Sequence, residues 1–257
     1  MLKLSIDGYS FHGLLDQGKM DIFHYFESVK YRYGILAVGI WNGFLPGTEE
    51  HYLKKVREAL DEKGLVVANL AVDQASVWDD DEASREAFRR NALDHIRAAA
   101  YIGAASVRID WGIHSHELNE EQWEFISSRY REYCSIAADN GMVLGPENHF
   151  GASLDPNLQL KMVEAVSHPA YKILLHLGRW KVNADTGDQM VAPHVMHTHV
   201  DQRTAEAEPE ARIGALVNGG YDGYWGIEYG SGKDEYVMVE WQLARTKRAL
   251  VKVCQGE

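Results

Sequence analysis

The chain has 257 residues, of which 46% are hydrophobic and 25% charged, and its formal net charge is −12. This composition can build one large core, and the length is typical of one (β/α)8 barrel, so we expect residues 1–257 to form a single domain. The acidic balance disfavours nucleic acid and anionic membranes as partners, and no run of Lys and Arg offsets it.

The sequence gives few signs of targeting or of disulfide bonding. The N-terminal residues lead directly into a strand pattern, and no apolar stretch approaches the length that spans a bilayer. The two cysteines, Cys134 and Cys254, belong to no CxxC pattern. We therefore expect a soluble, cytoplasmic protein.

Segments typical of buried strands alternate with amphipathic helical segments along the chain. Most of the strand candidates are nearly continuous apolar runs, as parallel strands covered on both faces are. They are residues 2–10, 35–41, 65–72, 106–111, 142–147, 172–177, 195–200 and 224–229. Eight strands close the commonest parallel barrel, so the pattern predicts an α/β fold, a single (β/α)8 TIM barrel. An open doubly wound sheet is the alternative, disfavoured because no glycine-rich phosphate loop follows the first strand.

The helical segments carry capping signals. Thr48 is the expected N-cap of one helix, and Pro156 is well placed in the first turn of another. Between the sixth and seventh strands, only residues 179–194 are available, and they include Gly187 and Pro193. The sixth helix is therefore expected to be shortened or missing.

Four apolar runs in the C-terminal half end in a carboxylate or an imidazole. The residues at these ends are Glu147, His176, His199 and Glu228. Because the C-terminal ends of barrel strands face one cleft, we expect the four side chains to bind one divalent metal ion. Two imidazoles favour manganese, zinc, cobalt or iron over magnesium, and manganese is our first expectation.

Two further histidines lie beside these candidates. His197 alternates with His199 and should face the same side of the sheet, as a donor behind the ligand or as part of a packed layer. His149 lies two residues beyond Glu147 and is our candidate acid/base, with a sugar contact or a plain loop position as alternatives. His176 has its own alternative, a core histidine whose hydrogen bonds are satisfied.

Other polar and aromatic residues at or beyond strand ends are candidate substrate contacts. The arginines among them suit hydroxyl, carboxylate or phosphate groups, although solvated surface positions are an equal alternative. The candidates are His12, Trp41, Asp110, Trp111, Arg179 and Arg203.

Three motifs resemble those of a known family. They are Pro146-Glu147-Asn148-His149, residues 197–201 and residues 221–229. The chain resembles the xylose isomerase-like barrel superfamily, and within it the sugar phosphate isomerase/epimerase group that includes ketose 3-epimerases and inosose dehydratase. The resemblance implies Glu147, His199 and Glu228 as metal ligands. The sixth strand departs from the family pattern, because His176 stands where the family usually has Asp.

The resemblance also implies a reaction. We expect a divalent-metal-dependent isomerase or epimerase of a ketose or related keto-sugar, in which Glu147 and Glu228 remove and return a proton through an enediolate. The alternative is a metal-dependent lyase, a dehydratase or a 3-oxo-glycoside or C-glycoside-cleaving enzyme, with His149 as the acid. A DNA-repair nuclease on this fold is disfavoured by the acidic charge, and a non-catalytic binder is a further alternative. The expected partner is a small sugar, and a homo-oligomer stays open.

Overall fold

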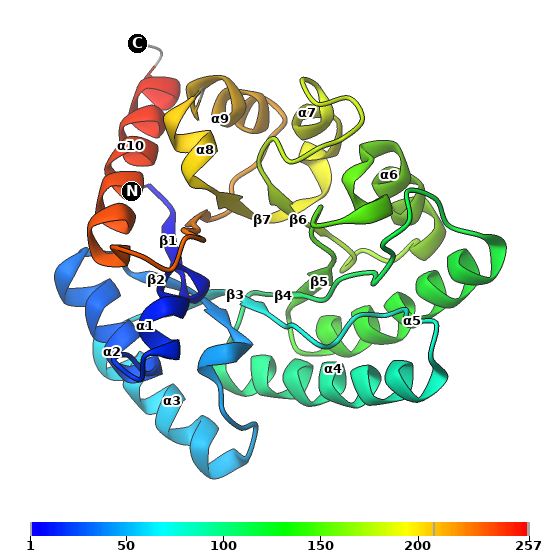
Figure 1. Cartoon of the computed structure of the whole chain (residues 1–257), viewed down its shortest axis with the longest axis horizontal. Helices are drawn as coiled ribbons and strands as arrows, with labels where there is room; N and C mark the ends of the chain where they lie inside the picture. Colours follow the sequence, from blue (N-terminus) through cyan, green and yellow to red (C-terminus); the bar gives the residue numbers. More distant parts are fainter. Residues whose placement is uncertain (1, 208, 256–257) are drawn as a thin grey trace.

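The computed structural model describes residues 2–207 and 209–255. Eight parallel strands lie in the order β5-β4-β3-β2-β1-β8-β7-β6, with helices around them, as Figure 1 shows. The predicted TIM barrel is therefore confirmed. The strands are β1 (Leu4–Asp7), β2 (Ala37–Trp41), β3 (Val66–Ala71), β4 (Ser106–Arg108), β5 (Val143–Gly145), β6 (Ile173–His176), β7 (Val195–Val200) and β8 (Trp225–Ile227).

Strands β5 and β6 close the barrel with less regular pairing than the other neighbours. Parallel bridges join Leu144 to Tyr171 and Glu147 to Leu174. The amide of Leu174 donates to the carbonyl of Pro146 at 2.9 Å. The pairing of β5 with β6 therefore continues to Glu147, two residues beyond the last residue of β5. It fixes the backbone that carries the Glu147 side chain.

The side chain of Asn148 extends the same pairing. Its Oδ1 accepts from the backbone amide of His176 at 2.7 Å, and its Nδ2 donates to the His176 carbonyl at 2.9 Å. Asn148 is fully buried and out of reach of water, so these two bonds satisfy the polar atoms of its side chain. The amide side chain thus acts as one more rung of the sheet and fixes the backbone of His176.

Helices cover the outside of the barrel (Figure 1). The longer ones are α3 (Glu50–Lys63), α4 (Glu82–Ile102), α5 (Glu120–Asp139), α6 (Pro156–Val166), α9 (Pro209–Asn218) and α10 (Glu235–Gln255). The shorter ones are α1 (His12–Asp16), α2 (Ile22–Glu27), α7 (Gly187–Val191) and α8 (Gln202–Glu206). With five residues, α7 confirms the shortened sixth helix. No helix among the described residues is long and apolar enough to cross a membrane.

Local sequence explains most helix ends. Asp81 caps α4 by accepting from the amide of Ser84, and Pro156 occupies the first turn of α6 as predicted. Gly64 ends α3 with a φ of 59°, a conformation that favours glycine. The predicted cap at Thr48 is wrong, because the N-cap of α3 is Glu49, and no side chain of the described residues caps this helix.

We predict that Asn148→Ala destabilises the barrel. The substitution leaves the buried amide and carbonyl of His176 without their partners, which typically costs about 1–3 kcal/mol. Urea unfolding should show this loss, whereas the exposed Asn157→Ala on α6 should change the free energy of unfolding by less than about 0.5 kcal/mol. Equal stability of the two variants would contradict the role given to Asn148.

Candidate active site

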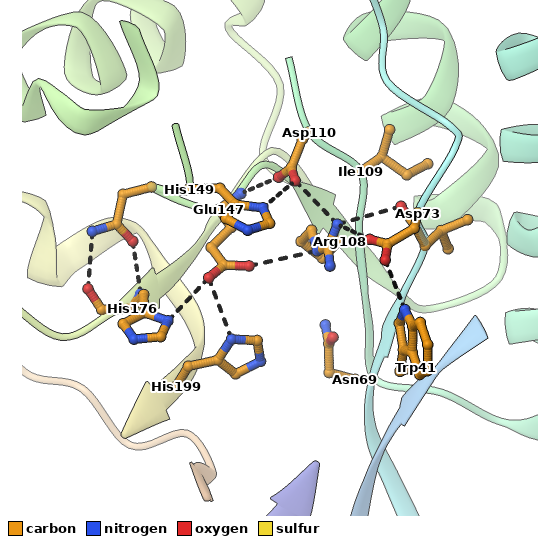
Figure 2. A network of polar contacts seen from close by, with 12 residues as sticks. Trp41, Asn69, Asp73, Arg108, Ile109, Asp110, Glu147, His149, His176 and His199 are labelled. Carbon is orange, nitrogen blue, oxygen red and sulfur yellow. Dashed lines mark hydrogen bonds and ion pairs between the residues drawn. The ribbon is translucent and has the colours of Figure 1, made fainter. Parts of the chain in front are cut away.

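Four predicted residues meet where the strands open. Potential ligand atoms of Glu147, His176, His199 and Glu228 all lie within 4.8 Å of one another. Nδ1 of His176 is 3.2 Å from Oε1 of Glu147, and Nδ1 of His199 is 3.4 Å from the same oxygen (Figure 2). Glu228 closes the group, with its two oxygens each 3.3 Å from one of these nitrogens.

The donor atoms of this group fit a divalent cation. The His199 side chain is 3% exposed, and among residues 2–207 and 209–255 its Nδ1 finds no hydrogen-bond partner. This buried nitrogen instead faces carboxylate oxygens of both Glu147 and Glu228. Two imidazoles and two carboxylates make an N/O donor set that suits manganese, iron, cobalt or zinc. The structure therefore contains a group able to hold a metal ion.

In this buried group, Glu147 and His199 stabilise each other's charged forms. Burial alone raises the pKa of the Glu147 carboxyl, but His199 and His176 outweigh burial and hold this pKa well below its usual range. Burial lowers the pKa of His199, yet Glu228, Glu147 and Asp7 outweigh it and raise that pKa to about 9. A cation would bind in place of the proton on His199.

Asp7, at the end of β1, lies behind the histidines and was missed by the sequence analysis. Its Oδ1 is 3.4 Å from Nε2 of His197 and 3.9 Å from Nε2 of His199. Asp7 makes no hydrogen bond to His199 at this distance, and it acts on that ring through its negative charge, which helps to raise the pKa of His199. His197 is fully buried, and among the described residues neither of its ring nitrogens has a hydrogen-bond partner.

Two glycines on the neighbouring strands make room for the Asp7 carboxylate. A Cβ at Gly39 of β2 would lie 1.6 Å from Asp7 Oδ1, and one at Gly226 of β8 would lie 2.3 Å from Asp7 Oδ2. Any larger residue at either position would displace the carboxylate. The glycines therefore belong to the site although they carry no functional group.

An ionic network supports Glu147 from the β4 side (Figure 2). Asp110 accepts from the backbone amide of Glu147 at 3.0 Å and from Nη1 of Arg108 at 3.0 Å. Nε of Arg108 lies 3.6 Å from the Glu147 carboxylate. The same guanidinium also pairs with Asp73, which accepts from the Trp41 indole. Burial raises the pKa of Asp110, but Arg108 and His149 outweigh it and lower that pKa, so Asp110 stays ionised.

His149 and Asp110 form an imidazole–carboxylate pair. Nδ1 of His149 is 2.9 Å from Oδ2 of Asp110. Because an ionised carboxylate can only accept a hydrogen bond, Nδ1 carries the proton. The His149 ring also lines the cavity described next, and its side chain is 38% exposed. Asp110 lies buried behind Glu147 and His149 and is not a lining residue of this cavity, so its predicted place as a substrate contact at the cavity surface is wrong.

A cavity of about 220 Å³ opens beside the four-residue group. It is smaller than the roughly 300 Å³ at the lower end of common ligand pockets, a size that suits a small ring. This inner cavity is lined by Asp7, Tyr9, Ile40, Trp41, Ala71, Asp73, Arg108, Glu147, His149, Arg179, His199 and Glu228.

The other predicted contacts lie at different distances from the inner cavity. Arg179 lines it and donates to Glu147 at 3.0 Å. His12 lies one layer back, stacked on the lining residue Tyr9 with ring centroids 4.4 Å apart. Arg203 lines an adjoining hollow instead.

Trp111 departs from its expected place in the cavity wall. Its side chain is buried in the core, where the indole nitrogen donates to Tyr171 at 3.3 Å. The strand end that was expected to carry Trp111 into the cavity stops at Arg108, three residues earlier. Trp111 therefore packs the barrel wall.

The chain belongs to the xylose isomerase-like TIM barrel family, whose sequence profile matches residues 30–248. Three solved structures share the fold at low identity. L-ribulose 3-epimerase aligns with a TM-score of 0.79 at 13% identity, covering 100% of this chain and 98% of that chain. The 3-keto-D-glucoside 4-epimerase YcjR from E. coli aligns with a TM-score of 0.78 at 16% identity, covering 96% of this chain and 100% of that chain. The probable 3-DHS dehydratase AsbF from Bacillus anthracis aligns with a TM-score of 0.72 at 15% identity, covering 96% of this chain and 100% of that chain. A comparison with curated proteins finds no match.

We predict that metal-depleted protein binds about one Mn²⁺ per chain and that Asp7→Asn weakens this binding, because it removes a negative charge 3.9 Å from His199. His176→Asp should keep a site and His176→Ala should weaken it. Calorimetric titration measures all three. The exposed Asp139→Asn on α5 is the matched control for Asp7→Asn. Binding at wild-type strength in both Asp7→Asn and His176→Ala would contradict the assigned site.

Proposed function

We propose that this protein is a divalent-metal-dependent epimerase or isomerase of a small keto-sugar. The observation that carries the proposal is the convergence of Glu147, His176, His199 and Glu228 within 4.8 Å. The small inner cavity beside them supports it, because it offers arginine, carboxylate and aromatic side chains to one sugar-sized molecule. The epimerases of the same fold provide a precedent for the substrate class.

The two glutamates are the proton-transfer groups in this proposal. A divalent ion in this donor set would act as a Lewis acid toward the substrate carbonyl and lower the pKa of the neighbouring C–H. One carboxylate removes that proton, and the C–H electrons form the C=C bond of an enediolate. The other carboxylate returns a proton to the opposite face for epimerisation, or to the adjacent carbon for isomerisation.

The surroundings of the glutamates suit these roles. His199 and His176 hold the pKa of Glu147 well below its usual range, so this carboxylate is ionised and able to accept a proton. Arg179 and Arg108 lie 3.0 and 3.6 Å from it. Glu228 is more open, with a side chain 16% exposed compared with 2% for Glu147. The more accessible carboxylate can exchange its proton with solvent between the two steps.

A lyase is the second candidate, favoured by the His149–Asp110 pair. After proton removal, the enediolate electrons can expel an oxygen substituent from the β carbon, and the departing oxygen then needs a proton. His149, held through Nδ1 by Asp110 and present in the cavity wall, would donate that proton from Nε2 when protonated. The dehydratase of the same fold is a precedent for such chemistry.

We predict that Glu147→Gln and Glu228→Gln each lower turnover by at least about 100-fold, the contribution typical of a positioned acid or base. The measurement is deuterium incorporation from D₂O into a keto-sugar by Mn²⁺-loaded enzyme, with circular dichroism to show that the barrel stays folded. The exposed Glu240→Gln on α10 is the control and should exchange at the wild-type rate. Normal exchange in either active-site variant would refute its role.

The same assay separates the two candidates. We predict that His149→Asn leaves deuterium exchange within about tenfold of wild type if the enzyme is an epimerase, because the glutamates carry both proton transfers. For a lyase, product release from a keto-sugar with a leaving group should fall by about 100-fold or more while exchange continues. Chromatography of the released group measures the second outcome. Release by wild-type protein at a rate matching exchange would replace the epimerase with the lyase.

A further inference from the structure

The four-residue group lies between two hollows, not at the end of one. The second, which we call the outer hollow, has a volume of about 450 Å³ and opens between the loops after β6, β7 and β8. Arg203, Gln202, Glu206 and Ser231 line it on the side away from the inner cavity. Tyr9, Arg179 and Glu228 line both hollows and form the wall between them.

The ligand candidates divide between these two spaces. Glu147 and His199 face the inner cavity, His176 faces the outer hollow, and Glu228 faces both. A substrate whose reacting carbons lie beside Glu228 therefore has space on two sides. The inner cavity accommodates one small ring, and anything attached to that ring on the side of Glu228 extends into the outer hollow.

The charges of the outer hollow indicate what it accepts. Two arginines, Arg179 and Arg203, face three carboxylates, those of Asp201, Glu206 and Glu228. Asp201 is already engaged, 3.3 Å from Nε2 of His176 and accepting from the amide of Thr204. Arg179 is already paired with Glu147, and Glu228 belongs to the four-residue group, so the charges left for a ligand, those of Arg203 and Glu206, balance. A phosphate would therefore gain no net attraction here, whereas hydroxyl groups can both donate to the carboxylates and accept from the arginines.

We propose that the outer hollow binds a neutral, hydroxyl-bearing substituent of the substrate, so that the preferred substrate is a keto-sugar glycoside and not a free or phosphorylated monosaccharide. This inference rests on the proposed keto-sugar activity and names its substrate class. It assigns Arg203, Gln202 and Ser231 to recognition of the substituent, at a distance from the reacting carbons.

The test compares three probes with Mn²⁺-loaded full-length protein: 3-keto-glucose, its glucosyl glycoside and its 6-phosphate. Calorimetry gives the dissociation constant of each, and deuterium exchange gives kcat/KM. The expected result is that the glycoside binds roughly tenfold or more tightly than the free sugar, as two net hydrogen bonds would provide. The phosphate should bind no better than the free sugar.

A variant that fills the outer hollow locates the effect. In Ser231→Trp the ratio of glycoside to free-sugar affinity should fall to near one, because the new ring occupies the space of the substituent. Ser135→Trp, on the exposed surface of α5, should keep the wild-type ratio. Because both affinities are measured with the same variant, this ratio is unaffected by any loss of affinity that the two ligands share.

The outcomes separate the two claims. Exchange in all three probes with equal affinity, or a glycoside preference that survives Ser231→Trp, would overturn the substituent site and leave the keto-sugar activity standing. Tighter binding of the 6-phosphate than of the free sugar would overturn the proposal that the outer hollow binds a neutral substituent. No exchange and no binding with any probe would overturn the proposed activity, and this inference with it.

Discussion

The site depends on one buried carboxylate, that of Glu147, being surrounded by imidazole and guanidinium groups. Two imidazoles and two guanidiniums approach it, and its side chain is 2% exposed. Without these partners an ionised carboxylate would not remain buried. The barrel supplies them from separate strands: His176 from β6, His199 from β7 and Arg108 from β4. The closed sheet is therefore a condition for the charged group to exist, and the group explains why polar residues end so many apolar strands.

The sequence predicted that these residues converge because its signals are local. Glu147, His176, His199 and Glu228 each follow an apolar run, and a parallel barrel brings all such ends together. Strand β7 (Val195–Val200) was predicted with its observed limits. The ends of the other strands are less certain in sequence, since pairing with neighbours decides where a strand stops.

The supporting layer could not be predicted in the same way. Asp7 also ends a strand, but its role depends on Gly39 and Gly226, which lie on two neighbouring strands and matter only through the space they leave. Asp110 was expected at the cavity surface, yet the chain turns it behind Glu147, where a backbone amide and Arg108 hold it. Trp111 follows it into the core. Such roles arise from three-way contacts in space, and no spacing along the chain encodes them.

The most direct test of the account is pulsed electron paramagnetic resonance of the protein loaded with one equivalent of Mn²⁺. We expect nitrogen couplings from two imidazoles, one lost in His176→Ala and the other in His199→Ala. Each imidazole is contributed by a different strand, so the spectrum reports the assembled group itself. A spectrum without nitrogen coupling, or one unchanged in both variants, would show that the metal binds elsewhere and would contradict the central claim.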